Sequence, residues 1–187
     1  MAKARRTFVV AEAGVNHDGD VEKALDIINA AAEAGVNAVK FQTFTAERLV
    51  SSIAPVANYQ KRNTGRNETQ LSMLSKLQLS RDDHFLIAER CKEKDVEFMS
   101  TAFDESSLKF LVSELGVRKL KIASGEITNG PFLLEHAKFD LDILLSTGMA
   151  NNTDIDKALG VLACGFQREE VSAETNFAIT DRSSEGW

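Results

Sequence analysis

Cysteine is scarce in this sequence, with Cys91 and Cys164 as its two examples. They form no CxxC pair, which argues against a zinc site or a disulfide framework. We therefore expect two reduced thiols, as in a cytoplasmic protein. Histidine is also scarce, and no HxH or HxxxH pair occurs, so the sequence predicts no metal ligand within the chain.

The sequence also lacks an excess of positive charge and a long apolar run. Its formal net charge is −6, which argues against a general nucleic-acid binder, because such a protein needs a basic face. A few local lysines can still bind a small anion. The start, MAKARR, is basic, but the apolar run after it contains Glu12 and is too short for a signal peptide or a membrane span. We expect a soluble cytoplasmic protein that binds neither nucleic acid nor a membrane.

What the sequence does contain is a regular alternation of apolar runs and helical patterns. The 43% hydrophobic content is typical of a folded globular protein. Short apolar runs predict strands at 7–14, 36–44, 96–103, 119–126 and 142–149. Helical spacing predicts helices at 21–35, 81–95, 105–116, 131–139 and 154–165. Capping residues support the helix starts, namely Asp20, Ser80 and Asp104.

Five strand–helix units in strict alternation predict an α/β fold with a parallel sheet. An open doubly wound sheet and a TIM-type (β/α)8 barrel are both compatible with this order. Polar residues at the carboxyl end of every strand favour the barrel, because a barrel gathers those ends around one active site. A complete barrel needs about 250 residues, so we expect an incomplete one. We predict a partial barrel over 1–165 and a divergent or disordered tail over 166–187, with a functional loop over 45–70.

Lys40 and Lys121 are the strongest candidates for function. Each lies in an apolar strand at an alternating position that would face a barrel interior. A buried lysine must be paired or must meet an anion, because an uncompensated buried charge is costly. Three interpretations remain open: an internal ion pair with Glu12 or Glu126, capture of a phosphate or carboxylate, or a Schiff base with a carbonyl substrate. Two lysines with neighbouring hydroxyl groups slightly favour the anion.

Carboxylates and hydroxyls lie at the same strand ends. Glu12 and Glu126 are either an acid–base pair, or hydrogen-bond acceptors for a polyol, or counter-charges for the lysines. Ser124 and Ser146 offer hydroxyl groups to an anion.

The three histidines are weaker candidates. His17 follows the first strand, and we expect it in an exposed loop. His84 and His136 fall within predicted helices and are interpreted as structural residues.

Seven segments occur here in the order and spacing found in the sialic acid synthase family. They are AEAGVNHDG, VNAVKFQTF, YQKRNTG, MLSKLQLS, FMSTAFD, KIASGExTNxP and ILLSTGM. Over about residues 7–165 the chain resembles the N-terminal part of that family's barrel, and it looks nearest to the bacterial legionaminate-type branch. Seven ordered segments are far more specific than any one of them.

The resemblance implies a transferase of nonulosonic acid biosynthesis that forms a carbon–carbon bond. Phosphoenolpyruvate is condensed with an N-acetylated aldose, such as N-acetylmannosamine or a 2,4-diacetamido-trideoxyhexose, and phosphate is released. The resemblance also implies a divalent metal, Mn or Mg, which polarises the sugar aldehyde as a Lewis acid. Its implied partners are small-molecule substrates and a second copy of the chain in a homodimer.

The resemblance also implies roles for individual residues. Lys40 and Lys121 bind phosphoenolpyruvate, with hydrogen bonds from Gln42, Ser124 and Ser146. Glu12 contacts sugar hydroxyls and Glu126 lies near the reacting centre, so these two are the expected catalytic residues. Three residues of the long loop are expected on the sugar side, namely Tyr59, Gln60 and Asn63.

The chain departs from the family pattern after Gly165. A sixth-strand motif close to LHCTxxYP, the later metal-binding histidines and the C-terminal antifreeze-like domain do not occur in it. We therefore expect a truncated form with little or no activity alone, without the metal ligands and with its homodimer in doubt. The alternatives are a Schiff-base barrel aldolase and a non-catalytic, anion-binding remnant.

Overall fold

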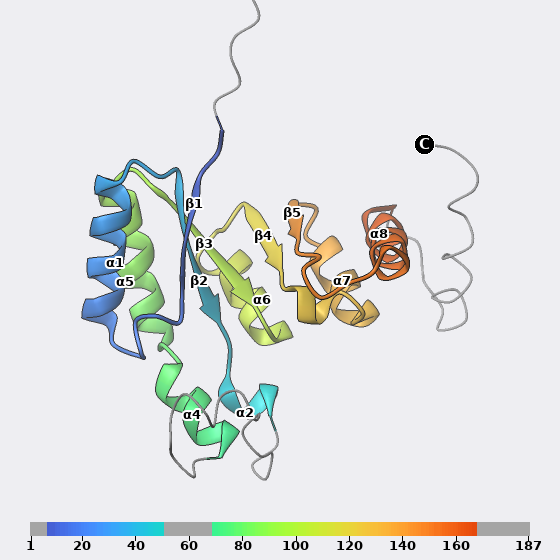
Figure 1. The fold of residues 1–187 in the computed structure, drawn as a ribbon, viewed down its shortest axis with the longest axis horizontal. Helices are drawn as coiled ribbons and strands as arrows, with labels where there is room; N and C mark the ends of the chain where they lie inside the picture. Colours follow the sequence, from blue (N-terminus) through green and yellow to red (C-terminus); the bar gives the residue numbers. More distant parts are fainter. Residues whose placement is uncertain (1–6, 51–68, 168–187) are drawn as a thin grey trace, which may run out of the picture. The chain divides into compact units, whose positions relative to one another are not determined.

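A computed structural model describes residues 7–50 and 69–167 of the chain (Figure 1). Its strands are β1 (Val10–Gly14), β2 (Ala38–Thr43), β3 (Glu97–Ala102), β4 (Lys119–Ile122) and β5 (Asp142–Leu145). Its helices are α1 (Val21–Glu33), α2 (Ala46–Leu49), α4 (Gln70–Leu77), α5 (Arg81–Glu93), α6 (Glu105–Ser113), the 3-10 turn η1 (Ser124–Glu126), α7 (Gly130–Ala137) and α8 (Asn152–Gln167).

Within the described residues the strands form one sheet in the order β1-β2-β3-β4-β5. The pairs β1–β2, β3–β4 and β4–β5 are parallel. The predicted alternation of strands and helices is confirmed. The fourth strand is shorter than predicted, because it ends at Ile122 and the next residues turn into η1, where the Glu126 amide donates to the Ala123 carbonyl at 3.0 Å.

The chain divides into two compact units, Met1–Ser100 and Thr101–Trp187, which are described separately. In the first unit, helices α1 and α5 lie side by side against one face of β1 and β2 (Figure 1). Alternate strand residues point into this layer, including Ala13, Val39 and Phe41, and they pack against buried Ile28 and Ile87 of the helices. The remaining alternate residues of these strands therefore point to the opposite face.

The predicted helix starts are confirmed by their side-chain caps. Asp20 accepts from the Glu22 and Lys23 amides at the start of α1. Ser80 forms a capping box with Asp83 at the start of α5, and Asp104 accepts from an amide of α6. These caps satisfy amide groups that would otherwise lack a partner.

The segment 45–70 that we predicted as a functional loop begins with a helical turn, and the helix α4 starts at its last residue. The short helix α2 begins at Ala46, and α4 begins at Gln70 after Thr69, whose side chain accepts from the Ser72 amide. Gln78 accepts a hydrogen bond from the Ala46 amide at 2.8 Å, which joins the two ends of the connection. Residues 51–68 lie outside the described part of the chain.

In the second unit, α7 and α8 pack against each other and against one face of β4 and β5. Leu133 and Ala137 of α7 and Leu162 of α8 meet Ile122 of β4 in this core. Helix α8 continues to Gln167, so the first two residues of the predicted tail are helical. The rest of that tail lies outside the described residues. None of the helices in the described ranges combines the length and the apolar character needed to cross a membrane.

Candidate functional site

Lys40 is buried on the face of β2 that points away from the helices. Its neighbours Val39 and Phe41 belong to the core under α1 and α5, and strand side chains alternate between faces. Lys40 lies directly opposite Glu12 in the parallel register of β1 and β2, so both side chains share one face. The strand predicted around Lys40 is present, and the orientation of Lys40 toward a barrel interior stays a prediction.

Glu12 and Lys40 form an ion pair on this face. The Lys40 Nζ lies 2.8 Å from both Oε1 and Oε2 of Glu12. The Lys40 side chain is only 9% exposed, whereas that of Glu12 is 59% exposed. The internal ion pair, one of the interpretations left open above, is therefore present. A largely exposed carboxylate thus pairs with a buried ammonium group.

Gln42 completes the cluster. A β-bulge between Glu12 and Gly14 shifts the register at the end of β1, where Gly14 has a positive φ of 54°. A Cβ at Gly14 would lie 3.4 Å from Oε1 of Glu12 and 3.6 Å from Nε2 of Gln42. An ammonium and an amide donor next to one exposed carboxylate can bind a phosphate or a carboxylate group. We call Glu12, Lys40 and Gln42 the β2 anion cluster.

In the second unit, Lys121 has the same orientation relative to its own helices. Leu120 and Ile122 are buried, and Ile122 contacts α7 and α8, so Lys121 points to the opposite face of β4. Its Nζ donates to the Ile122 carbonyl at 3.1 Å, and Thr101 of β3 lies opposite it in register.

The other predicted residues of the second unit lie at the ends of β4 and β5. Ser124 and Glu126 belong to η1, and Oε2 of Glu126 accepts from Nδ2 of Asn129 at 2.8 Å. Ser146 follows β5, and its amide donates to the Ile122 carbonyl at 3.0 Å. The predicted meeting of Lys40 with Lys121 involves both units and stays a prediction. Predictions for the long loop fall outside the described residues, namely Tyr59, Gln60 and Asn63.

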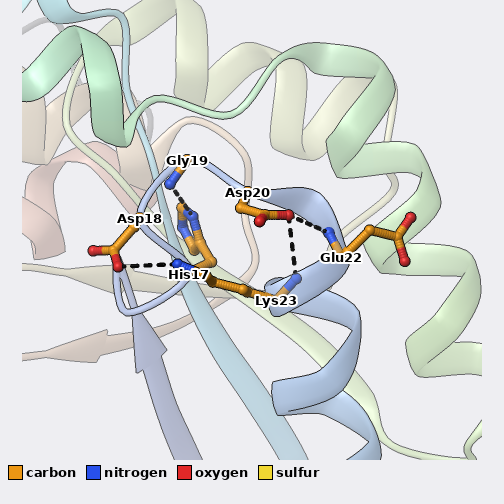
Figure 2. Close-up of polar contacts among 6 residues, drawn as sticks. All are labelled: His17, Asp18, Gly19, Asp20, Glu22 and Lys23. Atoms are coloured by element: carbon orange, nitrogen blue, oxygen red, sulfur yellow. Dashed lines mark hydrogen bonds and ion pairs between the residues drawn. The ribbon is translucent and has the colours of Figure 1, made fainter.

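The expectation that His17 is exposed is wrong. Its side chain is completely buried, with the ring centroid 6.1 Å from that of Phe41. Figure 2 shows the tight turn that holds it, in which the Gly19 amide donates to Nδ1 at 3.0 Å. Burial is the main cause that lowers the pKa of His17. The His17 ring therefore packs into the core beneath the turn. The polar residues around it in the sequence had suggested an exposed position.

A second buried polar group escaped the sequence analysis. Thr43 Oγ1 lies 2.9 Å from His84 Nε2 and 2.7 Å from Ser100 Oγ. His84 Nδ1 lies 2.7 Å from the Ser80 carbonyl, and burial lowers the pKa of the imidazole. The one signal in the sequence was the position of His84, four residues after the predicted cap.

The described residues do not fit a metal ion. In residues 7–50 and 69–167, no group of three or more His, Cys, Asp and Glu side chains could hold one. We therefore assign no chemical step to a metal within this part of the chain.

The chain is similar to known synthases. It is 49% identical to the N,N'-diacetyllegionaminic acid synthase of Legionella pneumophila over 152 residues, covering 81% of this chain and 42% of the relative. Identity to the Campylobacter jejuni protein of the same name is 43% over 169 residues, covering 90% of this chain and 50% of the relative. The chain thus spans at most half the length of these two relatives.

A solved structure supports the fold. The N-acetylneuraminic acid synthetase of Leptospira borgpetersenii, determined with citrate, matches with a TM-score of 0.72 and 31% identity. The match covers 87% of this chain and 52% of that protein. The prediction of a partial TIM-type barrel is confirmed. The NeuB family model matches residues 27–183, beyond the end of the resemblance expected near Gly165, and the chain belongs to the NeuB family.

Proposed function

We propose that this chain carries the phosphoenolpyruvate-binding part of a synthase that makes a sialic-type nonulosonic acid. The acceptor is an N-acetylated aldose, either N-acetylmannosamine or a 2,4-diacetamido-trideoxyhexose. Family membership and the names of the similar synthases support this choice. The observation that carries the proposal is the β2 anion cluster, in which the buried Lys40 ammonium pairs with a largely exposed carboxylate and Gln42 lies two residues further along the same face of β2.

In the proposed reaction, C3 of phosphoenolpyruvate attacks the aldehyde carbon of the open-chain sugar. The aldehyde oxygen takes up a proton, and water adds to the resulting cation at C2 and gives up a proton. The bond between C2 and the phosphate oxygen then breaks as the C2 hydroxyl group gives up its proton to the departing phosphate, which leaves a 2-keto acid. Glu126 and Glu12 are the proposed proton donor and acceptor, because Glu126 lies in the turn η1 that follows β4 and Glu12 lies within β1 beside Lys40.

The lysines bind the phosphate and carboxylate groups of phosphoenolpyruvate in this proposal. Lys40 and Lys121 supply positive charge, and Gln42, Ser124 and Ser146 supply hydrogen-bond donors. The sugar side is assigned to Glu12 and to residues of the long loop, namely Tyr59, Gln60 and Asn63. The divalent metal and the homodimer that the resemblance implies are proposed for the longer proteins of the family. We propose that this chain alone has little or no synthase activity.

Isothermal titration calorimetry with phosphoenolpyruvate tests the anion cluster. Lys40→Met removes the ammonium, and we expect binding to be lost. Lys23→Met is the control, because Lys23 of α1 is 54% exposed and pairs with Asp18 of the preceding turn at 3.4 Å. Loss of binding in both variants, or in neither, would contradict the assignment. A phosphate-release assay with manganese and candidate sugars tests turnover.

A Schiff-base aldolase is the second candidate function. Against it, the Lys40 nitrogen is held in an ion pair with Glu12, whereas a Schiff-base lysine must attack a carbonyl. Borohydride treatment in the presence of pyruvate would label Lys40 or Lys121 if this candidate were correct. We expect no label at either lysine.

A further inference from the structure

Three buried side chains form a hydrogen-bonded chain at the carboxyl ends of β2 and β3. Thr43 is 5% exposed, and His84 and Ser100 are each 2% exposed. The chain links Ser100 of β3 to Thr43 of β2, then to His84 of α5, and ends at the Ser80 carbonyl. Each donor–acceptor distance lies between 2.7 and 2.9 Å.

Chemistry fixes the direction of every hydrogen bond in this chain. A carbonyl oxygen can only accept, so Nδ1 of His84 carries a proton and donates to Ser80. Burial lowers the pKa of His84, so the ring is neutral near pH 7 and Nε2 is an acceptor. Thr43 therefore donates to His84, and its oxygen accepts from the hydroxyl of Ser100.

This series of hydrogen bonds connects Ser80, at the start of α5, to β2, the strand that carries the β2 anion cluster. Ser80 is held by its capping box with Asp83 at the start of α5. Thr43 is the last residue of β2, directly after Gln42 and three residues after Lys40. Strand ends open more easily than strand centres, because fewer contacts hold them. A buried side-chain bond at the last residue therefore restrains the part of β2 that presents Gln42.

We propose that His84 is a positioning residue that fixes the carboxyl end of β2 for anion binding, an inference that rests on the proposed function. His84 touches neither Lys40 nor an anion in this role. It acts through the Thr43 hydroxyl, which holds the strand against the start of α5. Removal of the Thr43 hydroxyl takes away the hydrogen bond that His84 Nε2 accepts and the one that the Ser100 hydroxyl donates. Both groups are buried, so the loss of these bonds destabilises the end of β2.

Four proteins test the inference: the parent chain, Thr43→Val, Thr43→Ser and His84→Phe. Valine keeps the shape of threonine and loses the hydroxyl, and serine keeps the hydroxyl. Phenylalanine keeps a ring and loses both nitrogens. Two measurements are made on each: amide hydrogen exchange along β2 and α1, and phosphoenolpyruvate affinity by calorimetry.

Exchange at Gln42–Phe44 should be about tenfold faster or more in Thr43→Val and His84→Phe, as expected for a lost buried hydrogen bond. The amides of α1 should be unaffected. Phosphoenolpyruvate affinity should fall by about fivefold or more in the same two variants, and Thr43→Ser should restore both properties. If His84→Phe does not fold, the threonine pair carries the comparison.

Faster exchange throughout β2 and α1 would indicate a purely structural role and would overturn the inference. Local exchange with unchanged affinity would also overturn it. A parent chain that does not bind phosphoenolpyruvate would refute the proposed function, and the exchange pattern would still decide whether His84 holds the end of β2.

Discussion

Gly19 is the residue whose replacement should disturb the first unit most directly. It lies in the turn between β1 and α1 (Figure 2), and its φ is positive at 77°. A Cβ at this position would overlap the backbone carbonyl oxygen of Lys76 near the end of α4. Gly35 is a matched control, because its φ is 75° and no atom lies within 4 Å of the corresponding Cβ position. The two sites share a backbone conformation and differ in contact.

The conformation and the contact can therefore be separated. A non-glycine residue in the left-handed region costs about 1–2 kcal/mol, which is the expected loss of unfolding free energy for Gly35→Ala. Overpacking adds about 1–3 kcal/mol, so Gly19→Ala should lose roughly 2–5 kcal/mol. Urea denaturation followed by circular dichroism measures both.

Asparagine provides a second comparison, because it tolerates the left-handed region. Gly35→Asn should be nearly neutral, and Gly19→Asn should remain destabilised by the contact with α4. Equal losses at the two positions would refute the contact between the β1–α1 turn and α4. In that case the positive φ of Gly19 alone would explain why the turn requires glycine, without a contribution from the Lys76 carbonyl oxygen.

Three further predictions follow from the buried and paired groups. Burial raises the pKa of the Cys91 thiol to about 12, so iodoacetamide at pH 8 should leave Cys91 unmodified in the folded protein and label it in urea, as read by mass spectrometry. Burial lowers the pKa of His17, His84 and His136 below 6.5 in the folded state. Their stabilisation is therefore complete above about pH 6.5 and declines as the pH falls below it. Urea midpoints at pH 7 and pH 5 should show this decline, and His136→Leu should reduce it. Glu12→Gln removes the counter-charge of Lys40 and should strengthen the binding of inorganic phosphate. Calorimetry on the variant and the parent measures the difference. Weaker binding by the variant would show that Glu12 does not compete with the anion.

The fold was predictable where local rules and tertiary packing agree. Asp20, Ser80 and Asp104 satisfy amides at the starts of their helices, so local chemistry alone identifies the helix boundaries. The apolar runs identified the strands, and alternation within β2 puts Val39 and Phe41 in the core under the helices and Lys40 on the other face. The shortening of β4 was not predictable, because an apolar run continues into residues that close a 3-10 turn.

The polar interior was much harder to predict than the elements. His17 lies in a polar segment, but its ring packs on Phe41, which is 24 residues later in the chain. The hydrogen bonds among Thr43, His84 and Ser100 join residues separated by 41 and 57 positions. Such contacts depend on the docking of α5 against the sheet, which no local pattern encodes. The sequence predicts which strand or helix contains each residue. Which polar side chains meet depends on how those strands and helices pack.

The ion pair between Glu12 and Lys40 is compatible with an anion-binding role for the lysine, in which the anion displaces the Glu12 carboxylate. Lys40 is nearly inaccessible, so its charge cannot move into water and needs a negative partner at all times. Glu12 is more than half exposed, so its carboxylate regains hydration when it turns into solvent, and the incoming anion takes over the pairing of Lys40. An arriving phosphate or carboxylate can therefore replace Glu12 while Lys40 remains paired. The carboxylate then lies at the rim of the bound anion, where a second substrate with hydroxyl groups would meet it.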